Sequence, residues 1–588
     1  MKRLQALGVV EARLVSANRW LVIALMAAMA VLVFAMVIAG IAAIIVQGTI
    51  DPMVAVQTMF AAIDSFPLLA IPFFILAAEL LSGGALTEVL LRFAAQLGHR
   101  DSGAMRYWAM LSALLPVAIA ASVFAVAARS QGMGVEEARH LLNRTGFDAQ
   151  LREVDQFAKL TRREGVERLL AGVHTEARIP PPAWVKEWTD PRTVRAMNED
   201  ERRAFVRLQI ERALELKSWW LAEMLATPSP LTEHMTLFWH NHFTSSLQKV
   251  RSPALMYRQN VLLRKHALGN FGGLLHAVSR DPAMLVYLDS ATNRRGQPNE
   301  NFARELMELF TLGEGKYAEQ DIKEAARAFT GWSIDLDTGE FRFRPRQHDD
   351  GVKTVLERTV RTGDEVLDVL LAQPATAEYV AARLWREFVS PQPQPEELAR
   401  VAAVFRESGY EMRATLRALL LTPAFWSPQN RAALIKSPSD LVVGTLRQLA
   451  ISVNDPLPFV FLMRALGQDL LSPPNVKGWP GGEAWINSTT LLARKQFLER
   501  LLRVEESRMI MQQPAMREKV DNLKPGARRV MQAIADLNFS ARDWLAPFEG
   551  RESMVPLVLL AGAPAGNPSG GGMDYLRALV ADPVYQLK

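Results

Sequence analysis

The sequence contains no cysteine. This absence excludes disulfide bonds, thiolate metal sites, iron–sulfur clusters and a cysteine nucleophile. The net charge is also small. The chain has 67 Lys and Arg residues and 62 Asp and Glu residues, which gives a net charge of +5 on 588 residues. So weak a surplus does not indicate nucleic-acid binding, and we expect no nucleic acid among the partners. The 49% hydrophobic and 22% charged residues are typical of a packed globular chain.

Charged residues are missing from a long stretch near the N-terminus. None occurs in residues 20–50, and this run is longer than the roughly 20 residues that cross a bilayer core. We therefore predict a transmembrane helix here. Four basic residues and one acidic residue precede it, so the positive-inside rule places the N-terminus in the cytoplasm.

Two shorter apolar runs follow. Residues 66–78 include two prolines and suit a broken or re-entrant element as well as a full span. Residues 107–128 are uncharged and can be interpreted as a membrane span or as a signal peptide cleaved after Ala127. Under either interpretation, we expect the rest of the chain to be exported across the inner membrane. We expect that part at the periplasmic side of the inner membrane, held there by the N-terminal helices, or free in the periplasm after cleavage.

One segment of this apolar region resembles a known family. The string SFPLLAIPFFILA is followed by Gly83-Gly84 and the ending LRFAAQLGH, all within residues 52–100. It is similar to the N-terminal region of the large permease subunit of tripartite ATP-independent periplasmic (TRAP) transporters. The similarity stops near Arg100, and the further membrane helices of that family do not follow. The resemblance therefore implies an accessory or a fragment of a TRAP-type dicarboxylate transporter, and no transport residue is carried over.

Helical periodicity dominates beyond residue 129. We predict a mainly α-helical domain over residues 129–588 with one small β-hairpin at 333–344, where Asp337-Thr338-Gly339 forms the turn. The chain is then mainly α, with a membrane segment at 1–104 and a signal-peptide-like or transmembrane helix at 105–128. The helices expected from periodicity and stop signals are 136–143, 199–226, 299–312, 319–329, 376–388, 395–406 and 439–450.

Two histidines stand close together in the motif Trp239-His240-Asn241-His242-Phe243. Side chains at i and i+2 share a face only in an extended backbone, where His240 and His242 could both reach one divalent metal. On a helix they would diverge. The alternative is that both are core histidines packed among aromatic residues.

Carboxylates are dense in the motif PNENFARELMELF at 298–310. In a helix Glu300, Arg304 and Glu308 fall at i, i+4 and i+8 on one face, and Glu305 converges with Glu308 and Asn301. The sequence alone favours a structural amphipathic helix. The functional alternative is that Glu300, Glu305 and Glu308 serve as metal ligands or as catalytic acids and bases facing the histidines.

Three further sites carry polar residues of interest. Asp281 precedes Pro282, a pattern that predicts a helix N-cap. The pair His348-Asp349 follows the hairpin and could supply a ligand or a base. The Gly- and Pro-rich loop SPPNVKGWPGG at 472–482 either walls a pocket or fills a gap between helices. The remaining motif residues of interest are Asn241, Asn299, Asn475, Lys477 and Trp479.

Taken in order, WHNHF, RDPAML, PNENFARELMELFTLG, AFTGW and SPPNVKGWPGG resemble the bacterial family called domain of unknown function 1800. The resemblance runs from about residue 136 to the end, with ARHLLNRTGF at 138–147 as its first motif. It implies an exported protein, often with a signal sequence and encoded beside a sulfatase-like exported protein, which is the companion expected here. It implies no reaction, cofactor or catalytic residue.

The junction between the two resemblances is unusual. Residues 105–127 look like the signal peptide with which that family starts, so residues 1–104 look appended. Either they are a real fusion that tethers the domain, or two unrelated sequences were joined, which the loss of the permease motif near Arg100 favours.

Three functions stay open at this stage. The first is a metal-dependent or acid/base hydrolase that uses the histidines and glutamates. The second is a non-enzymatic binding or assembly module of the envelope, and the third is the transporter accessory.

Overall fold

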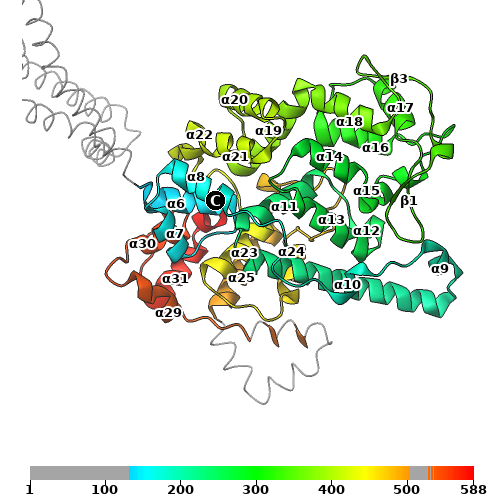
Figure 1. Cartoon of the computed structure of the whole chain (residues 1–588). Coiled ribbons are helices and arrows are strands. Elements are labelled where there is room, and N and C mark those ends of the chain that lie inside the picture. The colour runs from blue at the N-terminus through cyan, green and yellow to red at the C-terminus, as the bar shows by residue number, and fades with distance from the viewer. Residues whose placement is uncertain (1–131, 504–527, 530–531, 534–535) are drawn as a thin grey trace, which may run out of the picture. The chain divides into compact units, whose positions relative to one another are not determined.

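The computed structural model describes residues 132–503, 528–529, 532–533 and 536–588. The chain divides into two units, Met1–Arg129 and Ser130–Lys588, and everything below concerns the second (Figure 1). The transmembrane helix, the second apolar run and the signal-peptide-like segment predicted above lie outside the described residues. Within the described part, no helix is long and apolar enough to cross a bilayer.

The predicted helical character of the domain is confirmed. The long helix α10 (Glu199–Ala226) has the predicted bounds, because the Asn198 side chain caps its first turn and Pro228 follows its end. Gly146 ends α6 (Gly134–Thr145) as expected. The other predicted helices that form within two residues of their expected bounds are α17 (Glu319–Ala328), α19 (Pro374–Phe388), α20 (Pro395–Glu407) and α23 (Pro438–Gln448).

The rest of the described domain is built largely from shorter helices. They are α7 (Leu151–Phe157), α8 (Arg162–Ala171), α9 (Pro191–Ala196), α11 (Pro230–His242), α12 (Leu247–Val250), α13 (Pro253–Lys265), α14 (Phe271–Ser279), α15 (Pro282–Tyr287), α18 (Gly363–Ala372), α21 (Met412–Leu420), α22 (Pro423–Trp426), α24 (Leu457–Ala465), α25 (Ser488–Leu502), α29 (Ala541–Leu545), α30 (Met554–Leu559) and α31 (Gly572–Ala581).

The predicted helix at 299–312 forms only in part. An α-helix, α16 (Asn301–Glu305), passes directly into a π-helical turn at Leu306–Thr311. The wider turn changes the angular position of every later side chain, so the spacing of the glutamates along an ideal α-helix does not hold beyond Glu305.

Strands form two hairpins in the described residues, so the expectation of a single hairpin was wrong. The predicted one pairs β1 (Trp332–Ile334) with β2 (Phe341–Phe343), with Ser333 opposite Arg342. The second pairs β3 (Lys353–Val355) with β4 (Arg358–Val360). Its turn residues, Leu356 and Glu357, have φ of 47° and 63°. This conformation usually selects Asn or Gly, and the sequence therefore carried no turn signal.

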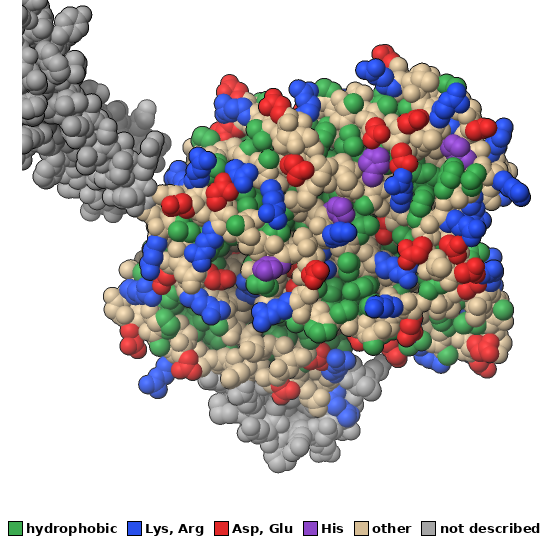
Figure 2. Space-filling model, viewed as in Figure 1, with side chains coloured by type: hydrophobic (Ala, Val, Ile, Leu, Met, Phe, Trp, Pro, Cys, Tyr) green, Lys and Arg blue, Asp and Glu red, His purple; other side chains and the backbone are tan. Residues whose placement is uncertain are grey.

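Helix α11 belongs to the core of the domain, where it packs against α6, α10 and α13 (Figure 1). Every side chain from Leu231 to His240 is buried, so this helix has no solvent-facing stripe. Its Glu233 pairs with Arg264 at 2.5 Å, with both side chains 1% exposed. On the surface, acidic and basic side chains are interspersed over the face seen in Figure 2, in keeping with the small net charge.

Candidate functional site

The two motif histidines lie on α11, not on an extended strand. Two helical residues i and i+2 are set roughly 200° apart around the axis, and the side chains have different surroundings. His240 contacts the rings of Trp220 and Trp479, at centroid distances of 5.7 and 5.6 Å. His242 Nε2 lies 3.0 Å from the carbonyl oxygen of Phe310 and donates to it in that tautomer. The structure therefore does not point them at a common ligand.

Burial makes both imidazoles neutral. It lowers the pKa of His240 to about 3, and it lowers the pKa of His242 well below its ordinary value, helped by the positive charge of Arg383. No group of three or more His, Asp or Glu side chains in the described residues is placed to hold a metal ion. A divalent metal at His240 and His242 stays a prediction.

Asn241, between them, joins two of the sequence motifs. Its Oδ1 accepts a hydrogen bond of 2.7 Å from the backbone N–H of Trp479, in the loop 472–482. Gly478, with a φ of 85°, passes so close to Asn241 that a Cβ there would lie 2.2 Å from Oδ1. The loop therefore needs glycine at position 478, because any side chain there would collide with Asn241 of α11.

The glutamates of the second motif separate into different contacts. Arg304 pairs with Glu300 at 3.1 Å, as the spacing predicts, but its other partner is Glu319 of α17, at 2.7 Å. Glu308 instead accepts a hydrogen bond of 2.9 Å from the hydroxyl of Tyr317. The predicted ladder from Glu300 through Arg304 to Glu308 does not form, because the π-helical turn rotates Glu308 away.

Glu305 is the carboxylate of this group with the most perturbed surroundings. It is half-buried, and burial together with the negative charge of Glu308 raises its pKa above the ordinary value. The positive charge of Lys477, from the loop 472–482, acts against this increase. Lys477 Nζ itself lies 3.3 Å from Glu314, and Asn475 Oδ1 accepts from the Lys477 N–H at 2.9 Å. The glutamate motif at 298–310 and the loop 472–482 thus come together near Glu305.

Several motif residues have structural partners. Asp281 is the predicted N-cap of α15: its Oδ2 accepts from the Met284 N–H and from Gln259 Nε2, both at 2.9 Å. Burial raises its pKa to about 7. Asn299 Oδ1 accepts from the Asn301 N–H at 2.9 Å.

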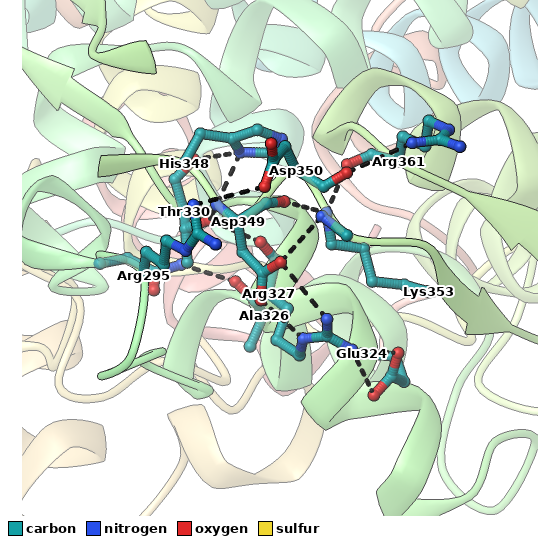
Figure 3. A network of polar contacts seen from close by, with 12 residues as sticks. Arg295, Glu324, Ala326, Arg327, Thr330, His348, Asp349, Asp350, Lys353 and Arg361 are labelled. Atoms are coloured by element: carbon teal, nitrogen blue, oxygen red, sulfur yellow. Dashed lines mark hydrogen bonds and ion pairs between the residues drawn. The ribbon is translucent and has the colours of Figure 1, made fainter. Parts of the chain in front are cut away.

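The pair His348-Asp349 belongs to a polar network between α17 and the segment after β2 (Figure 3). Arg327 Nε donates to Asp349 at 2.8 Å, and Arg327 also pairs with Glu324 at 2.8 Å. His348 Nδ1 lies 2.8 Å from the carbonyl oxygen of Thr330. The hydrogen bond from Arg327 lowers the pKa of Asp349. These contacts hold the segment against α17, and a role as ligand or base stays a prediction.

Two of the motifs, WHNHF and the loop 472–482, meet around one cavity of about 430 Å³. We call it the α11–α19 cavity, after two helices that wall it. Asn241, Trp479 and the residues Pro480 to Gly482 line it together with residues of α19, α23 and the C-terminal segment. A larger groove of about 890 Å³ lies between α9, α10 and α12–α13, but none of the motif residues lines it.

The charged residues of the α11–α19 cavity were missed in the sequence. They are His234, Arg383, Arg386, Glu387, Asp440 and Lys588. They come from α11, α19, α23 and residue 588, so no local spacing pattern brings them together. The one available signal was the histidine-rich region at 234–276, of which His234 is the first member.

His234 lies at the centre of this group. Its Nε2 is 2.7 Å from Glu387, and its Nδ1 is 3.9 Å from Asp440, while the rings of Phe147 and Phe388 pack against it. Burial alone would raise the pKa of Glu387, but the hydrogen bond with His234 and the charge of Lys588 hold it below its ordinary value. Burial acts in the same way on Asp440, but the charges of Lys588 and His234 hold its pKa below the ordinary value. Both carboxylates are therefore ionised near neutral pH.

The family of the domain is established by comparison. Residues 140–560 match the model of the family described as "Protein of unknown function (DUF1800)". The chain belongs to this family, as the order of its motifs implied.

The N-terminal part matches a different family. Residues 20–149 match "Tripartite ATP-independent periplasmic transporter, DctM component". A putative TRAP transporter large permease protein of Haemophilus influenzae is 33% identical over 92 residues, which are 16% of this chain and 22% of that protein. The 2,3-diketo-L-gulonate TRAP transporter large permease protein YiaN of Escherichia coli is 30% identical over 92 residues, with the same coverage. The chain spans about a fifth of the length of these relatives. No solved structure matches.

Proposed function

We propose that the domain is a binding module that takes a small polar molecule into the α11–α19 cavity. The observation that carries this proposal is the hydrogen bond between Asn241 and Trp479, which seats the loop 472–482 on α11 as a wall of that cavity. Motif residues far apart in the sequence thus build a single concave site in which aromatic and charged side chains converge, as in small-molecule sites.

The experiment is a thermal-unfolding screen of the full chain against neutral and charged small molecules. Pro391 lies exposed at the rim of the cavity, so Pro391→Trp places a bulky ring at the entrance. Gln394→Trp, exposed nearby but outside the lining, is the matched control. We expect a compound that raises the unfolding temperature of the native protein and of the control but not of Pro391→Trp. A compound that stabilises all three equally, or a screen with no stabilising compound, would contradict the proposal.

A second candidate function is acid–base catalysis at Glu305. It is favoured by the raised pKa of this half-buried carboxyl and by its position beside Glu308 and Lys477, a combination frequent at catalytic sites. The test is hydrolysis of chromogenic ester, phosphoester and sulfate-ester substrates. Activity that Glu305→Gln abolishes and the exposed control Glu314→Gln retains would support this candidate. Absence of activity in the native protein, or its persistence in Glu305→Gln, would count against it.

For location, we propose that the domain works at the periplasmic side of the inner membrane, near a transporter subunit or an exported sulfatase-like protein. The DctM match supports membrane association. Intact-mass measurement on membrane and periplasmic fractions tests this proposal. A full-length membrane species of 65.5 kDa supports a tether, a mature periplasmic chain that starts after Ala127 supports cleavage, and a cytoplasmic full-length species contradicts both.

A further inference from the structure

The pairing of the charged side chains in the α11–α19 cavity indicates the class of molecule that it holds. Its two carboxylates already have partners: Glu387 lies 2.7 Å from His234, and Asp440 lies 2.8 Å from Lys588 Nζ. Lys588 is thereby engaged, and Arg383 and Arg386 are the remaining cations of the lining.

These two arginines lie close together. Both line the cavity, and at a spacing of i and i+3 they are neighbours on α19. An arginine four residues before a glutamate on a helix would ordinarily pair with it, but Glu387 is bonded to His234 instead. Neither arginine makes a hydrogen bond or an ion pair with any residue of the described part of the chain. Two like charges held together without a carboxylate destabilise the free protein slightly, which a bound anion would reverse.

Resting on the proposed function, we propose that Arg383 and Arg386 bind an oxyanion group, a carboxylate, sulfate or phosphate, of the molecule held in the α11–α19 cavity. The planar guanidinium presents two parallel N–H groups that match such a group. Gly481 and Gly482 on the opposite loop leave open space where a side chain would start, so a ligand can approach the backbone there. Arg383 is half-buried and Arg386 exposed, so Arg383 is the more enclosed of the two.

The test uses the full chain at constant ionic strength, with succinate, inorganic sulfate and inorganic phosphate as anionic probes and erythritol as a neutral one. Affinity is measured by calorimetric titration for the native protein, Arg383→Gln, Arg386→Gln and Arg400→Gln. Arg400 lies exposed on α20, outside the cavity lining, and is the matched control. Arg383→Lys keeps the charge without the planar fork and separates loss of anion binding from loss of fold.

We expect at least one anion to bind the native protein. Each cavity substitution to Gln should weaken that binding by about tenfold or more, the effect of losing one charge-assisted hydrogen bond, whereas Arg400→Gln should change it less than about twofold. Arg383→Lys should retain part of the affinity. Equal weakening by all three Gln substitutions would overturn the inference, as would no binding of any anion. If a neutral molecule still binds in the cavity and Pro391→Trp blocks it, the inference fails while the proposed function stands. If nothing binds there, both fail.

Discussion

Asn241 Oδ1 lies 2.7 Å from the backbone nitrogen of Trp479 and accepts its hydrogen bond. The two residues are 238 positions apart, and this bond joins the core helix α11 to the loop that walls the α11–α19 cavity. Together with the ring contact between His240 and Trp479, it holds that loop against α11.

Replacing Asn241 with Ala should loosen the loop. The Trp479 N–H loses its acceptor, so the free energy of unfolding should fall by about 1–3 kcal/mol, and binding of any cavity ligand should weaken with it. Urea unfolding measures the first effect. Asn475→Ala, which removes only a local bond to the Lys477 N–H, is the control. An Asn241→Ala protein as stable as the native one would show that the loop is held by other contacts.

The neutral state of His240 should make the domain sensitive to acid. Its folded pKa, about 3, lies below the unfolded value of about 6.5. The unfolded state therefore binds more protons, and stability present above pH 6.5 is lost as the pH falls toward 3. His240→Phe, which keeps a buried ring, should reduce this slope between pH 4 and 6 by about 1.4 kcal/mol per pH unit.

The measurement is urea unfolding of both proteins over that pH range. Asp281 contributes the opposite slope, because its pKa of about 7 in the folded state lies above the unfolded value. It does so in both proteins, so the difference isolates His240. Equal slopes for the native protein and His240→Phe would show that His240 is charged in the fold.

The metal prediction for His240 and His242 has a direct test in metal content. If a metal is held there, the purified protein should contain about one equivalent of a divalent ion, and the double substitution His240→Ala and His242→Ala should remove it. Inductively coupled plasma mass spectrometry measures this content. Unchanged metal content in a folded double variant would exclude both residues as ligands.

Asp281 should tolerate Asn but not Ala. An amide oxygen in the place of Oδ2 still accepts from the Met284 N–H and from Gln259, so Asp281→Asn should change stability by less than about 1 kcal/mol. Asp281→Ala loses the N-cap of α15 and leaves Gln259 Nε2 unpaired, and should lower stability by about 1–3 kcal/mol. Similar losses in both variants, measured by thermal unfolding, would mean that the carboxyl group itself is required.

Features set by neighbouring residues could be predicted from the sequence. The helix α10 had its capping Asn198 and a following proline, and the hairpin β1–β2 had its Asp-Thr-Gly turn. The hairpin β3–β4 turns through Leu356 and Glu357, which give no turn signal, and only the surrounding fold holds them at positive φ. The π-helical turn after Glu305 likewise has no sequence signature.

The candidate site was harder to predict for the same reason. The motif residues Asn241 and Trp479 were singled out in the sequence, but they are 238 positions apart, so their contact could not be predicted. Arg383, Arg386 and Glu387 lie in a helix whose sequence looks like an ordinary amphipathic one, and only the partner His234 on α11 shows why Glu387 does not neutralise Arg383. Sequence spacing describes neighbours on one helix, and this site is made between helices.

Native mass spectrometry of the gently purified full chain tests most directly whether the α11–α19 cavity holds a small molecule. We predict a non-covalent small-molecule adduct on the native protein and on Gln394→Trp, and none on Pro391→Trp. The absence of an adduct from the native protein, or the same adduct on Pro391→Trp, would contradict the account.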